Sequence, residues 1–141
     1  MTALTTDRNT PYRPGRDVVH PVAASVQIFA GALVMLDSDG NAIPAKAAAN
    51  LKIAGRAEQH IDNRTGVVGD KTVAVQRGVF RFENDATNAV TRTHIGTLAY
   101  AVDDQTVCNA AGKNSKSIAG LIIDLDDDGV WIDTTQSGAT P

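Results

Sequence analysis

From residue 17 onward the chain consists of short apolar runs, rich in Val, Ile and Thr, that are interrupted every few residues by Gly, Asp, Asn or Pro. β-Branched side chains pack well on a pleated sheet, and Gly, Asp and Asn tolerate the backbone conformations of tight turns. The pattern therefore predicts an all-β fold, a small barrel or sandwich with at most one or two short helices, preceded by an extended N-terminal arm.

Turn residues separate ten expected strands. Hairpin turns are predicted at 37–41, 103–104 and 126–129, where Asp, Asn and Gly cluster between apolar runs. A short helical turn is predicted at 91–95, with Thr91 as its N-cap and Gly96 ending it. The expected strands are 18–24, 32–36, 42–45, 51–59, 72–77, 79–82, 98–102, 106–109, 118–125 and 130–133.

The apolar alternation changes phase between two of these strands. Val73 and Val75 occupy odd positions, whereas Phe80 and Phe82 occupy even ones, and Gly78 lies between the pairs. One extra residue in a strand shifts its side chains by one position, and Gly accommodates the distorted backbone. A β-bulge at Gly78 would keep all four side chains on the inner face.

The 141 residues predict one β domain at 17–133, an extended arm at 1–16 and a flexible tail at 134–141. Pro11, Pro14 and Gly15 prevent the arm from forming a helix. Only 4% of the residues are aromatic, so the core is expected to consist of small side chains. Because such a core stabilises the fold modestly, oligomerisation is a plausible supplement.

Charge divides the chain unevenly. Residues 1–16 carry three Arg and one Asp, a net charge of +2, and residues 17–141 carry the remaining 10 basic and 15 acidic residues, a net charge of −5. An acidic body argues against a general nucleic-acid binder, which needs a basic face. The longest apolar run, 28–36, is too short to cross a bilayer. We therefore expect no nucleic-acid or membrane partner.

The stretch DLDDDGVWI at 124–132 resembles the first half of an EF-hand calcium loop, with Asp124, Asp126 and Asp128 ahead of Gly129. An EF-hand needs a bidentate Glu at its twelfth position and flanking helices. Thr135 holds that position, and strand-forming residues flank the loop. A hairpin turn is favoured over a calcium site, and no metal site is predicted.

Candidates for catalysis are few. His20, His60 and His94 are scattered and show no metal-binding spacing. Cys108 and His94 could form a thiol and base pair, as in a cysteine hydrolase, but a buried inert Cys and a surface His explain both residues more simply. We predict no catalytic residues, no cofactor and no enzymatic activity.

The arm holds the more informative polar residues: Tyr12, Arg13, Pro14 and Arg16. Such a segment could be only a solvated terminus. Alternatively, it orders on a partner by pairing its backbone with a sheet edge, while Tyr and Arg, the residue types that often dominate interface energies, anchor it. These four residues are the candidate binding site.

The order of the sequence blocks resembles a family of phage and prophage capsid decoration (cement) proteins, long listed as a domain of unknown function. The family is encoded beside the major capsid protein. The resemblance covers residues 5–133, and no single block has catalytic meaning. The blocks are TTDRNTPYRPG, PVAASVQIFAGALVMLDSDGNAIPA, AGRAEQHIDN, GDKTVAVQRGVFRFEND, HIGTLAYAVDDQTV and AGLIIDLDDDGVWI.

The resemblance implies a structural virion protein, made in the host cytoplasm, that binds the outer surface of a tailed-phage head. It would bridge major capsid protein subunits, act as a homotrimer and contact the capsid through its N-terminal arm. The alternative is a receptor- or glycan-binding β module on the virion. That function would need an exposed aromatic platform, and four of the six aromatic residues lie within expected strands: Phe80, Phe82, Tyr100 and Trp131.

Overall fold

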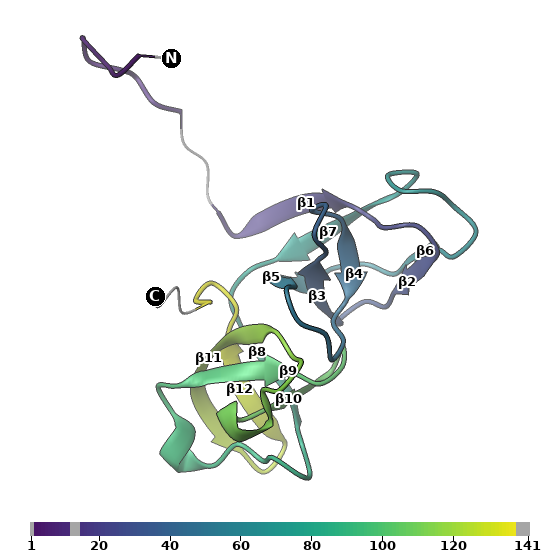
Figure 1. Cartoon of the computed structure of the whole chain (residues 1–141), viewed down its shortest axis with the longest axis vertical. Coiled ribbons are helices and arrows are strands. Elements are labelled where there is room, and N and C mark those ends of the chain that lie inside the picture. The colour runs from purple at the N-terminus through teal and green to yellow at the C-terminus, as the bar shows by residue number, and fades with distance from the viewer. Residues whose placement is uncertain (1, 12–14, 138–141) are drawn as a thin grey trace.

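The computed structural model describes residues 2–11 and 15–137, and in these segments the fold is all-β, as predicted (Figure 1). Two three-residue 3₁₀ turns, η1 (Arg92–His94) and η2 (Ala110–Gly112), are the only helical elements of the described chain. The strands are β1 (Asp17–Pro21), β2 (Val26–Ile28), β3 (Leu33–Leu36), β4 (Ala42–Pro44), β5 (Lys52–Ala57), β6 (Ile61–Asn63), β7 (Thr72–Gln76), β8 (Val79–Asn84), β9 (Leu98–Ala101), β10 (Thr106–Cys108), β11 (Ile118–Asp126) and β12 (Gly129–Asp133).

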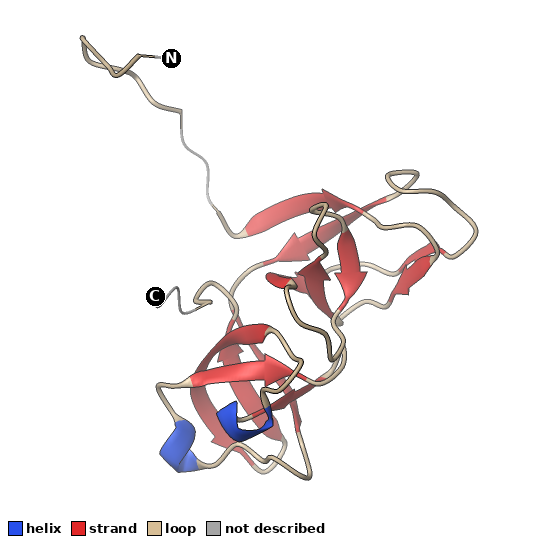
Figure 2. Ribbon diagram, in the orientation of Figure 1, coloured by secondary structure: helices blue, strands red, loops and turns tan. Residues whose placement is uncertain are grey.

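The first half of the chain forms a five-stranded sheet in the order β1-β7-β5-β3-β4, with all neighbours antiparallel. β2 and β6 pair as a separate antiparallel ribbon beside it (Figure 2). The second half closes into a barrel in the order β10-β8-β12-β11-β9, where only β10 and β8 are parallel. Closing the barrel removes exposed strand edges from this half of the body.

Two groups of buried side chains hold these layers together. One lies within the five-stranded sheet and its ribbon and includes Val34, Val73 and Val75. The other joins Leu33 and Met35 of β3 to the barrel interior. Because the second group draws on both halves, the sheet and the barrel share a core. Its barrel members are Phe82, Val90, Ala99, Ala101, Val107, Ala119, Ile122, Val130 and Ile132.

The β-bulge predicted at Gly78 is wrong, because the chain passes from one sheet to the other at this point. Val75 is buried in the sheet, and Phe82 is buried in the core shared with the barrel. Gly78 is held between the two by Thr134, whose hydroxyl accepts a hydrogen bond from the Gly78 N–H (2.9 Å). The apolar alternation changes phase because β7 packs within the five-stranded sheet and β8 within the barrel.

The hairpins at 37–41, 103–104 and 126–129 are confirmed as the connections β3–β4, β9–β10 and β11–β12. The predicted helical turn is also confirmed as η1, with Thr91 as N-cap. Strands β2 and β6 and the turn η2 were not predicted. Each has three residues, which is too short to show a periodic pattern.

The chain ends differ from the body. Residues 2–11 are exposed, contain no strand or helix and lie away from the five-stranded sheet and the barrel (Figure 1). At the other end, Thr134 is the first residue of the predicted tail, yet it is buried, and its N–H donates to the carbonyl of Gly78 (2.8 Å). The packed body therefore includes Thr134.

Candidate binding site at the base of the arm

The arm meets the body at Arg16. Its carbonyl accepts a hydrogen bond from the Arg77 N–H (2.6 Å), and the carbonyl of Gly15 accepts one from Arg77 Nη1 (3.2 Å). The Arg16 side chain is exposed. Tyr12, Arg13 and Pro14 lie outside the described residues. The structure thus places one of the four candidate binding residues, and places it where the arm joins the five-stranded sheet.

Strand β1, which follows Arg16 directly, lies at an edge of that sheet. It pairs with β7 on one side, from Asp17 opposite Gln76 to Pro21 opposite Thr72. In the part of the chain that the structure describes, no strand pairs with its other side. The Val19 side chain is 62% exposed. An edge strand of this kind offers its backbone N–H and C=O groups to an extended segment of a partner.

A hollow of about 720 Å³ opens beside Arg16, between the sheet and the barrel. It contains four of the chain's eight Arg residues, and none of the described residues that line it is Asp or Glu. Its polar lining is therefore strongly basic, in a body whose overall charge is negative. The lining residues are Arg16, Gly31, Arg56, Gln76, Arg77, Gly78, Val79, Phe80, Arg81, Phe82 and Trp131.

Arg56 is held in place by three contacts. Its guanidinium carbon lies 4.3 Å from the centre of the Phe80 ring. Its Nη2 donates to Glu58 Oε1 (2.9 Å) and to Gln76 Oε1 (2.8 Å). A guanidinium over an aromatic face gains cation–π attraction, and the two acceptors fix its orientation. Arg56 therefore forms a rigid wall of the hollow, with part of its charge offset by Glu58.

Arg81 and Trp131 form a second cation–π pair. They lie opposite each other on β8 and β12, with the guanidinium carbon 5.7 Å from the centre of the Trp131 ring. Arg81 Nη1 is 3.8 Å from Asp128 Oδ2, and the two side chains are 43% and 78% exposed. Ion pairs in water contribute little, so this carboxylate leaves Arg81 available to another anion.

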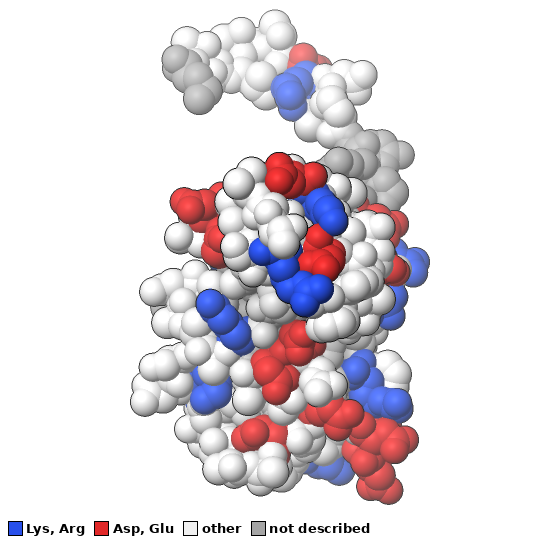
Figure 3. Space-filling model, turned by 90° about the vertical axis from the view of Figure 1, so that its right-hand side faces the viewer, with Lys and Arg blue, Asp and Glu red and all other residues white. Residues whose placement is uncertain are grey.

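Together these residues can bind carboxylates. A guanidinium presents a planar fork of N–H donors that matches both oxygens of a carboxylate, and aromatic faces accept the flat groups or apolar stems beside it. On the face drawn in Figure 3, basic and acidic side chains are interspersed and no broad basic patch forms. The four Arg that line the hollow contrast with the mixed charges of that face.

The acidic stretch at 124–132 forms the β11–β12 hairpin, which confirms the predicted turn. Asp126 Oδ1 accepts a hydrogen bond from the Asp128 N–H (2.8 Å), and Asp126 Oδ2 accepts one from Trp131 Nε1 (3.0 Å). Across residues 2–11 and 15–137, no three His, Cys, Asp or Glu side chains are grouped so that they could hold a metal ion. The hairpin orients the indole that lines the hollow.

The Asp126–Trp131 hydrogen bond predicts a pH-dependent signal. The indole N–H, assisted by the Asp128 N–H, holds the pKa of Asp126 below its ordinary value. The hydrogen bond therefore stabilises the fold above the carboxyl's ordinary pKa, about 3.9, and this contribution is lost as the pH falls through the lower folded pKa. Because Trp131 is the only Trp, we expect its fluorescence to titrate with a midpoint below that value.

Asp126→Asn should remove this titration step, while circular dichroism confirms that the chain stays folded over the same range. An unchanged titration in the variant would assign the signal to another carboxylate.

The Cys and His residues considered for catalysis lie in different surroundings. Cys108 is fully buried, and burial raises the pKa of its thiol, which disfavours a reactive thiolate. His94 is half-buried at η1, where its Nδ1 accepts a hydrogen bond from the Thr91 N–H (2.9 Å). His60 stacks on Phe29 with ring centres 5.2 Å apart. His94 and His60 therefore each have a structural partner, and Cys108 is enclosed in the core.

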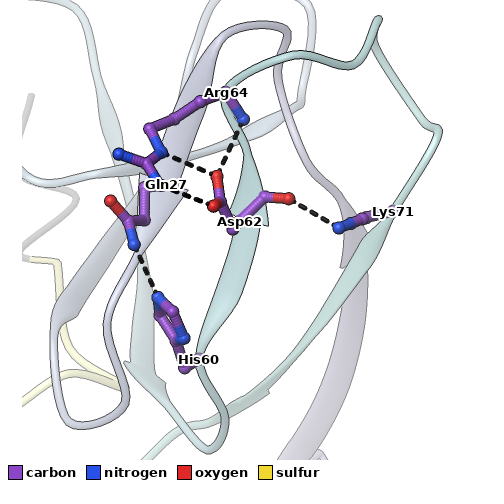
Figure 4. A network of polar contacts seen from close by, with 5 residues as sticks. All are labelled: Gln27, His60, Asp62, Arg64 and Lys71. Carbon is purple, nitrogen blue, oxygen red and sulfur yellow. Dashed lines mark hydrogen bonds and ion pairs between the residues drawn. The ribbon is translucent and has the colours of Figure 1, made fainter.

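A polar network on the β2–β6 ribbon was not predicted (Figure 4). The Asp62 carboxylate accepts from Arg64 Nε (2.9 Å) and Nη2 (2.8 Å), which lowers the pKa of Asp62, and the Asp62 carbonyl accepts from Lys71 Nζ. Gln27 contacts His60 at 2.7 Å. Because these groups satisfy one another, the network braces the ribbon and leaves little capacity for a ligand.

Sequence reasoning identified Arg16 and missed Arg56, Arg77 and Arg81. These three lie at or beside strand positions that look like ordinary exposed polar sites in the sequence. The sequence did contain one sign of this site, because Arg77 and Arg81 flank Gly78, where the apolar alternation changes phase. Their grouping became visible only when the strands were placed in register.

Comparison of the chain with models of protein families, with curated proteins and with solved structures gives no match. No helix among the described residues has the length and apolar character needed to cross a membrane.

Proposed function

We propose that this protein is a structural, non-catalytic component of a phage virion that binds the outer surface of a tailed-phage head and bridges major capsid protein subunits. The resemblance of residues 5–133 to capsid decoration proteins supports this proposal. The observation that carries it is the arrangement at the base of the arm. An exposed segment leads into an edge strand with an unpaired side, beside a hollow lined by four Arg.

This arrangement suits attachment by an extended segment. The arm adds contacts along the partner's surface, and the unpaired edge of β1 can add main-chain hydrogen bonds. Neither element needs a deep cavity. A homotrimer, which the resemblance implies, would bind through three arms, and each further arm would then bind at high effective concentration. Modest individual contacts would be sufficient for firm attachment.

Co-sedimentation tests the proposal. Purified protein is mixed with heads that lack decoration protein, assembled from the major capsid protein that the resemblance implies is encoded beside it. It is also mixed with heads that already carry it. We expect saturable binding to the bare heads, little binding to the decorated ones and greater resistance of the bare heads to heat after binding. Native mass spectrometry of the free protein tests the trimer.

Absence of binding to bare heads would contradict the proposal. Binding to host cells or to glycans without binding to heads would favour the receptor-binding alternative.

A further inference from the structure

The Arg-lined hollow has the composition of a docking site for an acidic peptide. The long side chains of Arg16, Arg77 and Arg81 gather at one hollow without an acidic lining residue among the described ones. Collecting like charges is unfavourable unless an anion offsets them, and each pair of close guanidinium groups raises that cost. The hollow is therefore complementary to a ligand that brings carboxylates.

We propose that this hollow binds a short Asp- or Glu-containing segment of the partner protein. The inference rests on the proposed function for the identity of that partner, the capsid surface. Arg16 and Arg77 would hold carboxylates at the sheet side. Arg81, stacked at 5.7 Å on Trp131, would hold one at the barrel side.

The neighbouring elements favour a peptide as the occupant. Arg16 lines the hollow and immediately precedes β1, whose outer edge is unpaired, so a segment that pairs with the start of this edge would lie close to a residue of the hollow. The stacked Arg56 and Phe80 provide a flat wall for the apolar part of such a segment. A nucleic acid is less suitable, because its extended phosphate backbone would also approach a body of net charge −5.

The carboxylates already nearby leave the hollow's charge partly unmatched. Glu58 is bonded to Arg56 at 2.9 Å, and Asp128 is 3.8 Å from Arg81. Asp133 lies near enough to Arg77 to interact with it electrostatically. In the described residues no ion pair within 4 Å is formed by Arg16 or Arg77. These two side chains are therefore the best test positions. Arg16 is exposed, and Arg77 is half-buried with its Nη1 donating to the carbonyl of exposed Gly15, so their replacement by Gln is not expected to unfold the protein.

Trp131 provides the measurement, because the only Trp of the chain lines the hollow. Full-length protein is titrated with a short, capped peptide of alternating Glu and Ala, and with the same peptide carrying Gln in place of Glu. We expect a saturable change in Trp131 fluorescence with the Glu peptide only. The apparent affinity should fall as salt is added, because exposed charges are screened.

The double variant Arg16→Gln/Arg77→Gln should weaken this binding about tenfold or more, since it removes two charge-assisted hydrogen-bond donors. The double variant Arg92→Gln/Lys113→Gln is the matched control, because it removes the same charge from residues that do not line the hollow. It should bind the peptide as the unmodified protein does. Circular dichroism verifies that both variants are folded.

Equal weakening in the two double variants, or no response to the Glu peptide, would overturn the assignment of the hollow. A fluorescence response to a single-stranded oligonucleotide but not to the peptide would overturn it in favour of a nucleic-acid site. Failure of the proposed function is distinguishable, because it would appear as peptide binding without binding to bare heads. Head binding without peptide binding would reject only the hollow's assigned role.

Discussion

Deletion of residues 2–14 is expected to abolish binding to bare heads while the β body remains folded. The deleted segment contains Tyr12 and Arg13, the residue types that most often anchor interfaces. The loss of two anchors worth about 2 kcal/mol each weakens binding by about a thousandfold. If three arms act together, the loss is larger because avidity disappears as well. Co-sedimentation with bare heads measures the effect.

The deletion should end at Pro14 because Gly15 and Arg16 are bonded to Arg77 through their carbonyl groups. Retaining them keeps the start of β1 and the hollow intact. Trp131 fluorescence should then respond to the Glu peptide as in the full-length chain. This response is the internal control, since it separates loss of the arm from loss of the body's structure.

A second control keeps the amino-acid composition of the arm and changes the order of its residues. An arm with residues 2–14 scrambled has the same charge and length, so it should bind heads as poorly as the deletion variant if specific contacts are responsible. Full binding by the deletion variant would exclude the arm mechanism. Full binding by the scrambled arm would reduce its role to nonspecific electrostatic attraction.

The fold could be predicted where strands were long and bounded by turn residues. The β11–β12 hairpin is an example, because its strands are rich in Ile, Leu and Val and its turn contains Asp127 and Asp128. β2 and β6 could not be predicted, because VQI and IDN are too short and too polar to show alternation. Their pairing depends on tertiary packing, including Ile28 in the core of the five-stranded sheet.

The candidate site was less predictable than the fold. Arg56 and Phe80 are far apart in the sequence, and their contact requires the sheet and the barrel to be placed together. The phase change around Gly78 was observed correctly but explained wrongly, because a bulge and a change of sheet both reverse the apolar phase. The two explanations are distinguished by the placement of β7 in the sheet and β8 in the barrel, and by the presence of Val75 and Phe82 in different groups of buried side chains.

Gly120→Ala is expected to destabilise the protein more than most surface or loop substitutions. Gly120 has φ of +154° at the register shift between β11 and β9. A Cβ there would lie 2.4 Å from the carbonyl oxygen of Asp133 and 2.6 Å from Ile132 Cγ2. The unfavourable φ alone costs about 1–3 kcal/mol. Relieving the clash must also displace β12, because one of the contacted atoms is backbone.

Gly40→Ala is the matched control for this prediction. Gly40 also has positive φ, +83°, but an added Cβ would meet nothing within 4 Å. Its substitution should cost about 1–2 kcal/mol from backbone strain alone. For Gly120→Ala we expect a total loss of at least about 3 kcal/mol, which corresponds to roughly 10 °C in Tm for a chain of this size. Urea unfolding followed by Trp131 fluorescence measures both variants. If both variants lost the same unfolding free energy, strand β12 would have to move aside at little cost. The close packing of β11 on β12 would then not explain why residue 120 is glycine.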